Sequence, residues 1–182
     1  MENHISKMQI MLAGSISLIL PLLFFFGSAS SQNLFEEEFK VTKVFDGDTF
    51  EAAASSGHKI RVRLAGIDAP ETAKQQSPAQ PYSRKSKEYL EKAVLNKTVQ
   101  IKGYGRDQYD RQLAEVFVSG RNISIELLES GLAEVYQGKL PEALDAQAYR
   151  QAETNARNSR KGSWSLGDSY VSPKTWRKLH NF

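Results

Sequence analysis

Cysteine is absent from this 182-residue chain, and its three histidines do not cluster in the sequence. The absence of cysteine excludes disulfide bonds and thiolate metal sites. The charge is not extreme either, because 24 Lys and Arg residues face 21 Asp and Glu residues, a net charge of +3. This excess is compatible with a polyanionic partner but does not by itself indicate one. For a metal site, the chain is left with a shell of mostly oxygen ligands.

The first 30 residues differ from the rest of the chain. Lys7 precedes an apolar run over 10–26, and small residues follow over 27–31. This order is typical of a secretory signal peptide that is removed after export. The alternative is an uncleaved membrane anchor, since the run approaches the roughly 20 residues that span a bilayer. Both interpretations predict a secreted or cell-envelope protein, periplasmic or extracellular, in which residues 31–37 form a linker.

Hydrophobic patterning beyond this linker predicts a small α+β domain. The chain is 40% hydrophobic and 10% aromatic, which is typical of a folded protein, and its length suits one domain. Three strands are expected to follow one another up to Leu64, because apolar residues alternate and turn residues such as Asp46-Gly47 separate them. Further strands are expected over 98–102 and 113–118, and helices over 83–95, 123–130 and 141–158. Residues 167–182 are polar and basic and are expected to form a loosely ordered tail.

Charged residues recur at the ends of the expected strands. They are Asp46, Asp48, Arg63, Asp68, Glu71 and Arg111. Carboxylates bind a hard cation such as Ca²⁺, and guanidinium groups bind phosphate through paired hydrogen bonds. A metal ion and two arginines together can stabilise the negative charge that develops during hydrolysis of a phosphodiester bond.

Two blocks of sequence resemble one known family. Asp46-Gly47-Asp48-Thr49 is followed by Arg63-Leu64-Ala65-Gly66-Ile67-Asp68-Ala69-Pro70-Glu71, and together they resemble the staphylococcal nuclease family. The likeness covers residues 38–166, a span that also contains Asp107 to Ala114 and Trp164. It implies a five-stranded OB-fold β-barrel with three packed α-helices.

The resemblance also implies a calcium site. Asp48, Asp68 and the backbone carbonyl of Ala69 correspond to the metal ligands of the family, and Asp46 corresponds to a residue that supports them. The family usually has threonine at position 69, but a backbone ligand survives the change to alanine. An ordinary turn role stays open for Asp46, because aspartate is common in turns.

The remaining residues correspond to catalytic groups. Arg63 and Arg111 match the arginines that stabilise negative charge on the phosphorane. Glu71 matches the proposed general base, although a carboxylate there can equally position the attacking water. The family usually has glycine at position 110, and aspartate tolerates the positive φ expected there. Its charge is expected to repel the substrate or to compete for Arg111, and the alternative is that the side chain points to solvent without effect. Arg61 is interpreted as a solvated surface residue.

The implied function is Ca²⁺-dependent hydrolysis of DNA and RNA by a monomer, with single strands preferred and 3′-phosphate ends left. Two other interpretations stay open: a non-catalytic OB module that binds nucleic acid or protein, and an interaction platform anchored by residues 10–26. The presence of every charged site residue argues against the non-catalytic module. Tyr109 and Tyr136 match the family's substrate-contacting tyrosines less well and are interpreted as buried aromatics.

Overall fold

The computed structural model describes residues 38–74 and 76–180. The signal peptide or anchor expected over 1–30 and the linker expected over 31–37 lie outside the described residues. Within the described ranges, no helix has both the length and the apolar character needed to cross a membrane.

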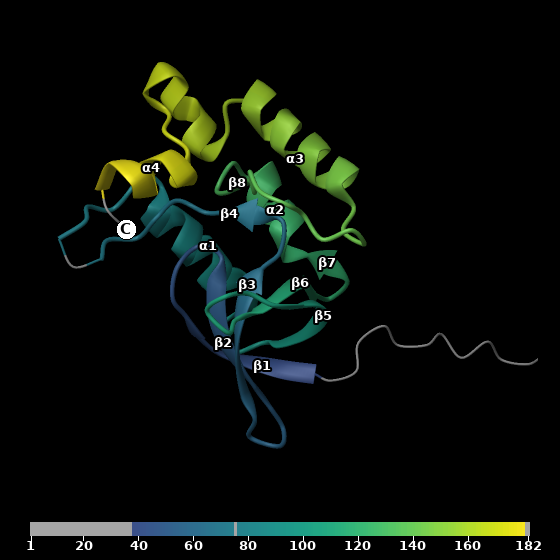
Figure 1. Cartoon of the computed structure of the whole chain (residues 1–182). Helices are drawn as coiled ribbons and strands as arrows, with labels where there is room; N and C mark the ends of the chain where they lie inside the picture. The colour runs from purple at the N-terminus through teal and green to yellow at the C-terminus, as the bar shows by residue number, and fades with distance from the viewer. Residues whose placement is uncertain (1–37, 75, 181–182) are drawn as a thin grey trace, which may run out of the picture. The chain divides into compact units, whose positions relative to one another are not determined.

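Short strands and helices follow one another as expected for an α+β domain (Figure 1). The strands are β1 (Glu38–Val44), β2 (Thr49–Ala54), β3 (Lys59–Leu64), β4 (Ile67–Asp68), β5 (Thr98–Arg106), β6 (Gln112–Val118), β7 (Arg121–Asn122) and β8 (Glu134–Val135). The helices are α1 (Ser83–Val94), α2 (Ile123–Glu129), α3 (Ala146–Asn158) and α4 (Pro173–His180), with 3₁₀ turns, η1, over Gly162–Ser169.

Five of the strands close into a barrel. β1, β2 and β3 form the antiparallel meander that the sequence predicted, β1 also pairs with β5, and β5 pairs with β6. A parallel pairing of β3 with β6 closes the sheet on itself and sets Val62 opposite Gln112 and Leu64 opposite Ala114. The predicted α+β fold with a five-stranded OB-like barrel is therefore confirmed.

Alternating apolar side chains fill the barrel, as the pleat of a half-buried sheet requires. Buried members of this core include Val41, Phe50, Val62, Leu64, Val99 and Val116. Helix α2 packs against β6 on one side and α3 on the other. The expected helical packing is thus present, and the barrel provides a rigid base for the loops at its ends.

The turn between β1 and β2 owes its glycine to close packing. The predicted hairpin is present, although neither Asp46 nor Gly47 has the positive φ that is common in an Asp-Gly turn. A Cβ at Gly47 would lie 2.7 Å from the Cβ of Ala69 and would collide with Ser86 of α1. The absence of a side chain therefore lets α1 and residue 69 press against the turn that carries Asp46 and Asp48.

Helix α3 begins later than the sequence suggested. Pro141 was expected to open it, but residues 141–144 form a turn in which the Leu144 N–H donates to the Pro141 carbonyl at 3.1 Å. The helix starts after Asp145, whose Oδ1 accepts a hydrogen bond from the Ala148 N–H at 3.0 Å. Aspartate is a strong N-cap, and this capping bond outweighs the preference of proline for a first turn.

The segment expected to be a loose tail contains a fourth helix, α4. Ser172 caps it, because its Oγ accepts a hydrogen bond from the Thr175 N–H at 3.1 Å, and Pro173 takes the first helical position. Serine followed by proline is a recognised helix start. The Ser172-Pro173 pair is therefore a local signal for α4 in the sequence. The polar and basic composition of the segment indicated a loosely ordered tail instead.

Candidate active site

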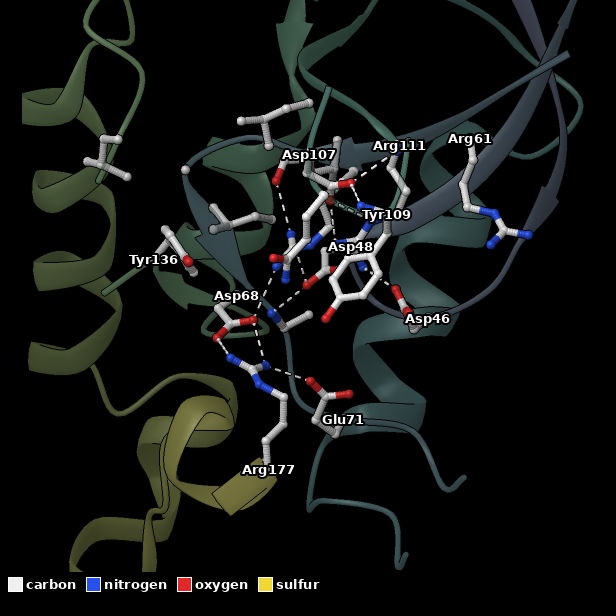
Figure 2. Close-up of a pocket in the computed structure, with 18 of the residues that line it drawn as sticks. Asp46, Asp48, Arg61, Asp68, Glu71, Asp107, Tyr109, Arg111, Tyr136 and Arg177 are labelled. Atoms are coloured by element: carbon white, nitrogen blue, oxygen red, sulfur yellow. Dashed lines mark hydrogen bonds and ion pairs between the residues drawn. The ribbon is translucent and has the colours of Figure 1, made fainter. Parts of the chain in front are cut away.

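All seven residues predicted for the site line one cavity of about 850 Å³ (Figure 2). They are Asp46, Asp48, Arg63, Asp68, Ala69, Glu71 and Arg111. The turn after β1, the end of β3, strand β4 and the loop before β6 each contribute some of them. The structure therefore brings together groups that the sequence separates by up to 65 positions, from 46 to 111.

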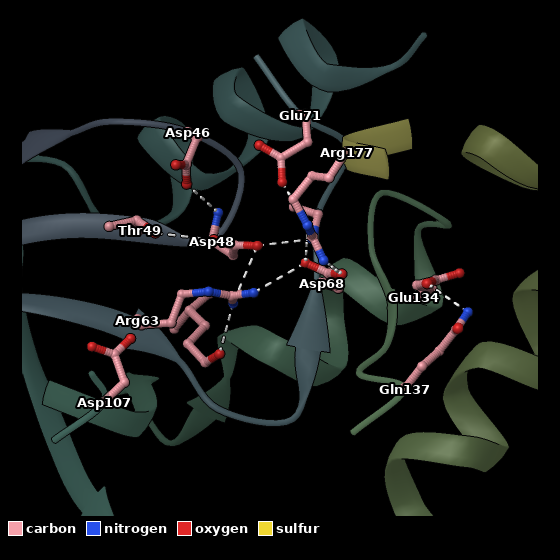
Figure 3. Close-up of polar contacts among 12 residues, drawn as sticks. Asp46, Asp48, Thr49, Arg63, Asp68, Glu71, Asp107, Glu134, Gln137 and Arg177 are labelled. Atoms are coloured by element: carbon pink, nitrogen blue, oxygen red, sulfur yellow. Dashed lines mark hydrogen bonds and ion pairs between the residues drawn. The ribbon is translucent and has the colours of Figure 1, made fainter. Parts of the chain in front are cut away.

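Arg63 lies between the two carboxylates that were predicted to bind metal (Figure 3). Its Nη1 is 3.1 Å from Oδ2 of Asp48, and its Nη2 is 3.2 Å from Oδ1 of Asp68. The side chain is only 13% exposed, and Nη1 also donates to the Leu64 carbonyl at 3.0 Å. One guanidinium thus neutralises both carboxylates and holds them close together.

Hydrogen bonds from neighbouring groups fix Asp48 in place. Its Oδ2 accepts from the Ala69 N–H at 2.8 Å, and its Oδ1 accepts from the Thr49 hydroxyl at 3.0 Å. The backbone N–H of Asp48 in turn donates to Oδ1 of Asp46 at 3.1 Å. Asp46 therefore supports Asp48 through the backbone of the turn. Burial, together with the nearby charge of Asp48, raises the pKa of Asp46 to about 7.

Asp68 has a buried acidic neighbour that the sequence analysis missed. Glu134 lies opposite it in the pairing of β4 with β8, and accepts hydrogen bonds from the Tyr170 hydroxyl at 2.6 Å and from Nε2 of Gln137 at 3.0 Å. Burial raises the pKa of Glu134 to about 7. The negative charge of Asp68 also raises this pKa, whereas the hydrogen bond from Tyr170 lowers it. Burial also raises the pKa of Asp68, although Arg177 and Arg63 oppose the shift. Asp68 and its neighbour Glu134 are thus both partly desolvated.

An arginine from α4 occupies the space between Asp68 and Glu71 (Figure 2). Nη1 of Arg177 is 2.6 Å from Oε1 of Glu71 and 3.0 Å from Oδ1 of Asp68, and its Nη2 is 2.7 Å from Oδ2 of Asp68. Burial opposes the charge on Arg177, but the bonds to Asp68 and Glu71 hold its pKa above the ordinary value. Arg177 lies in the segment that was expected to form a loosely ordered tail, so no pattern in the sequence indicated its place in the cavity.

Arg111 has a carboxylate partner of its own. Its Nε and Nη2 lie 2.7 Å and 2.6 Å from Oδ2 of Asp107, and Oδ1 of Asp107 accepts the backbone N–H groups of Tyr109 and Arg111. Burial would raise the pKa of Asp107, but the hydrogen bonds from Arg111 and the backbone hold it below its usual range. Asp107 therefore both shapes the loop and orients the guanidinium.

Aromatic side chains line the same cavity, and the prediction that they are buried was wrong. Tyr109 is 70% exposed and Tyr136 is 44% exposed. The ring of Tyr109 lies 5.3 Å from the guanidinium carbon of Arg111. Both rings come from loops rather than from the barrel core, which is why no core position encloses them. Their exposure makes them available for stacking on a base.

Arg61 is exposed, in agreement with its interpretation as a surface residue, and it also has an aromatic contact. It lines the cavity, and its guanidinium carbon lies 4.6 Å from the centre of the Phe45 ring, while Nζ of Lys43 lies 4.9 Å from the same ring. Two cations therefore flank one aromatic ring near the carboxylate cluster. Such contacts stabilise each cation by about 0.5–1 kcal/mol at exposed sites.

Comparison with known proteins identifies the family. The family model described as "Staphylococcal nuclease homologue" matches residues 61–166. The chain belongs to the staphylococcal nuclease family. The family that the sequence motifs suggested is confirmed, and with it the class of enzyme, a nuclease. The family match contains Arg63, Asp68, Glu71 and Arg111, whereas Asp48 lies before it.

Three curated proteins illustrate the likeness of this nuclease to its relatives. A "Probable endonuclease LCL3" of Debaryomyces hansenii is 34% identical over 168 residues, which cover 78% of this chain and 72% of that protein. A "Probable endonuclease LCL3" of Candida albicans is 34% identical over 167 residues, 77% of this chain and 71% of that protein. An "Uncharacterized endonuclease" of Haemophilus influenzae is 32% identical over 161 residues, 88% of this chain and 84% of that protein.

Nucleases of this family are generally metal-dependent, and the donor set fits a hard divalent cation. Asp48 and Asp68 supply carboxylate oxygens on either side of Arg63, and the backbone of Ala69 adjoins Asp48. Among the described residues, no three His, Cys, Asp or Glu side chains converge as a metal-holding group. A cation bound by two carboxylates would therefore need a backbone oxygen and water molecules to complete its coordination shell. Ca²⁺ readily takes such a mixed set of oxygen ligands. The Ala69 carbonyl ligand stays a prediction.

Asp110 adopts the backbone conformation expected of it but makes a different contact. Its φ is 60°, as the usual glycine at this position suggested. Its Oδ1, however, lies 2.8 Å from Nη1 of Arg106, and the side chain is 82% exposed. The expected competition for Arg111 is therefore wrong, because the left-handed turn points the carboxylate towards Arg106 while Asp107 takes Arg111.

This arrangement predicts opposite outcomes for two neighbouring aspartates. Asp107→Asn keeps an acceptor for the backbone N–H groups but presents a neutral amide to Arg111, so turnover should fall about tenfold through loss of orientation. Asp110→Asn, the matched control, should leave both kcat and KM close to those of the unaltered protein. Steady-state kinetics on single-stranded DNA at low salt measure both variants. A lower KM for Asp110→Asn alone would contradict this assignment.

Proposed function

We propose that this protein is a Ca²⁺-dependent nuclease that hydrolyses DNA and RNA, prefers single strands and leaves 3′-phosphate ends. The observation that supports this most directly is the contact of Arg63 with both Asp48 and Asp68, in the same cavity as Arg111. This contact supports the proposal because two carboxylates that could bind a cation lie in the same cavity as two guanidinium groups, and such groups stabilise the transition state of phosphodiester hydrolysis.

Each residue has a role that follows from its position. Arg63 and Arg111 would bind the non-bridging oxygens of the phosphate and stabilise the charge that these oxygens gain in the transition state. Glu71 would accept the proton of the attacking water or hold that water in line, since its carboxylate shares the cavity with both arginines. When bound at Asp48 and Asp68, Ca²⁺ supplies positive charge beside the scissile phosphate.

The preference for single strands rests on the cavity walls. Exposed Tyr109 and Tyr136 can stack on unpaired bases, and Arg61 and Lys43 add positive charge beside Phe45. In a duplex the bases are stacked on one another and are not free to reach such rings. The export segment predicted over 1–30 supports action outside the cell or in its envelope. We expect the protein to act as a monomer.

The role of Arg61 can be separated from that of the catalytic arginines. Arg61→Ala should raise KM for single-stranded DNA about three- to tenfold at low salt and leave kcat nearly unchanged, because one charged contact to the strand is lost. Arg84→Ala on α1 is the matched control, since Arg84 is 87% exposed and pairs with Glu88. A loss of kcat for Arg61→Ala equal to that for Arg111→Ala would contradict a binding role.

The proposal is tested by incubating the protein with single-stranded and duplex DNA and with RNA, in Ca²⁺ and in excess chelator. Cleavage should require Ca²⁺, should be faster on single strands, and should leave 5′-hydroxyl ends that a polynucleotide kinase labels without prior phosphatase treatment. Binding without cleavage would favour the non-catalytic module. Full activity in chelator would remove the metal from the mechanism.

A further inference from the structure

A second arginine, in addition to Arg63, lies on the carboxylate cluster. Arg177 contacts both oxygens of Asp68, at 3.0 Å and 2.7 Å, and an oxygen of Glu71 at 2.6 Å. Its side chain is 31% exposed, while those of Asp68 and Glu71 are 3% and 13% exposed. Arg177 thus takes the positions that a metal at Asp68 and a water at Glu71 would need.

Helix α4 is attached to the loop that carries Glu71, and this attachment aims Arg177 at the cavity. The Trp176 indole donates to the Pro78 carbonyl at 3.3 Å, and the Ser77 hydroxyl donates to the His180 carbonyl at 2.7 Å. Gln80 links both segments, since its Nε2 donates to the Val171 carbonyl at 2.7 Å and its Oε1 accepts the Glu71 N–H at 3.1 Å. Apolar contacts contribute little to this attachment, since Pro173 is the only buried residue of α4.

Such a polar attachment is of the kind that opens locally without unfolding the domain. The barrel is closed by pairings among β1, β2, β3, β5 and β6. Helix α4 takes no part in these pairings, so its release would leave the barrel closed. Electrostatics also make a joint occupancy unfavourable. A guanidinium in contact with both Asp68 oxygens and a divalent cation on the same carboxylate would lie within a few ångströms and repel each other.

We propose that α4 is an intramolecular inhibitor, in which Arg177 and a divalent cation compete for Asp68 and Glu71 and α4 must leave the cavity before the metal binds. The inference rests on the proposed metal site. It predicts that half-maximal activity requires a higher free concentration of the cation than the ligand set alone would require. If α4 is docked in about 90% of molecules, the apparent affinity for the cation is lowered about tenfold.

The first test measures Ca²⁺ affinity by calorimetry on the full chain and on three single variants. Arg177→Gln should bind Ca²⁺ about tenfold more tightly than the unaltered protein. Lys178→Gln removes a neighbouring charge on α4 and should change little. Lys74→Gln removes a cation 3.6 Å from Glu71 and measures the effect of charge alone, which should be smaller. An affinity of Arg177→Gln that is unchanged or weaker, or only equal to that of Lys74→Gln, would overturn the proposal.

The second test follows α4 itself. In a Trp164→Phe background, Trp176 is the only remaining tryptophan, so its emission should change on saturation with Ca²⁺ as the contact with Pro78 is lost. No change at saturating Ca²⁺ would overturn the displacement of α4. These binding readouts need no substrate, so tighter Ca²⁺ binding by Arg177→Gln in a protein without cleavage activity would refute the proposed function and leave this inference standing.

The same variant separates inhibition from catalysis. If Arg177 inhibits, Arg177→Gln should cleave single-stranded DNA at lower Ca²⁺ and reach an equal or higher maximal rate. If Arg177 instead stays in the cavity as a third phosphate-binding guanidinium, the maximal rate should fall by orders of magnitude with Ca²⁺ affinity unchanged. That second outcome contradicts the proposal.

Discussion

Arg63→Ala is expected to reduce turnover about 100- to 1,000-fold and to lower the free energy of unfolding by about 2–3 kcal/mol. A solvent-exposed arginine would contribute little to stability. In the structure, however, Arg63 is 13% exposed and lies between Asp48 and Asp68. Its removal would leave two nearly buried carboxylates with less compensation, which destabilises the folded state as well as the transition state.

Arg111→Ala is the comparison that separates the two effects. Arg111 is 24% exposed and pairs with one carboxylate, Asp107, so its loss should reduce turnover similarly with at most about 1 kcal/mol of destabilisation. Single-turnover cleavage at saturating Ca²⁺ and urea unfolding in the absence of Ca²⁺ measure the two quantities. Equal unfolding free energies for Arg63→Ala and the unaltered protein would show that Arg63 does not hold the carboxylates together.

Asp48→Asn is expected to weaken Ca²⁺ binding at least tenfold and to reduce cleavage at least a hundredfold at moderate Ca²⁺. The amide keeps an oxygen for the Ala69 N–H or the Thr49 hydroxyl but loses the negative charge that attracts a divalent cation. Mg²⁺ should serve poorly in the unaltered protein, because it requires compact octahedral geometry and gives up water reluctantly.

Asp46→Asn provides the control for this substitution. Its amide oxygen can still accept the Asp48 N–H, which is the contact seen in the structure. The variant should therefore keep most of its Ca²⁺ affinity. Calorimetry and cleavage over a range of Ca²⁺ concentrations measure both variants, and an unchanged Ca²⁺ affinity in Asp48→Asn would remove Asp48 from the metal site.

Local patterns in the sequence predicted the strands and most of the helices, while the resemblance to a known family implied the OB-fold barrel and the roles of the site residues. Alternation and turn residues predicted the meander of β1 to β3, and the helices expected over 83–95 and 123–130 correspond to α1 and α2. The charged residues at strand ends come together because a closed barrel brings the ends of its strands to the same rim. For these features, the information lies within a few residues of each position.

What the sequence could not reveal are contacts between distant segments. Arg177 meets Asp68 across 109 positions, and no periodicity or spacing predicts which tail residue reaches a cavity. Glu134 likewise lies beside Asp68 only through the pairing of β4 with β8. Residues that are adjacent in sequence do not always contact each other. Asp110 is next to Arg111 in sequence, yet its positive φ directs the side chain towards Arg106.

The parallel pairing of β3 with β6 also determines how far apart the two phosphate-binding arginines lie. Arg63 is opposite Leu113 in this pairing, two positions after Arg111, so the register of the barrel seam sets the spacing of the guanidinium groups. A slip by one residue would move an arginine to the other face of its strand. A substitution within the seam such as Leu113→Pro should therefore abolish cleavage by separating the two guanidinium groups that bind one phosphate together.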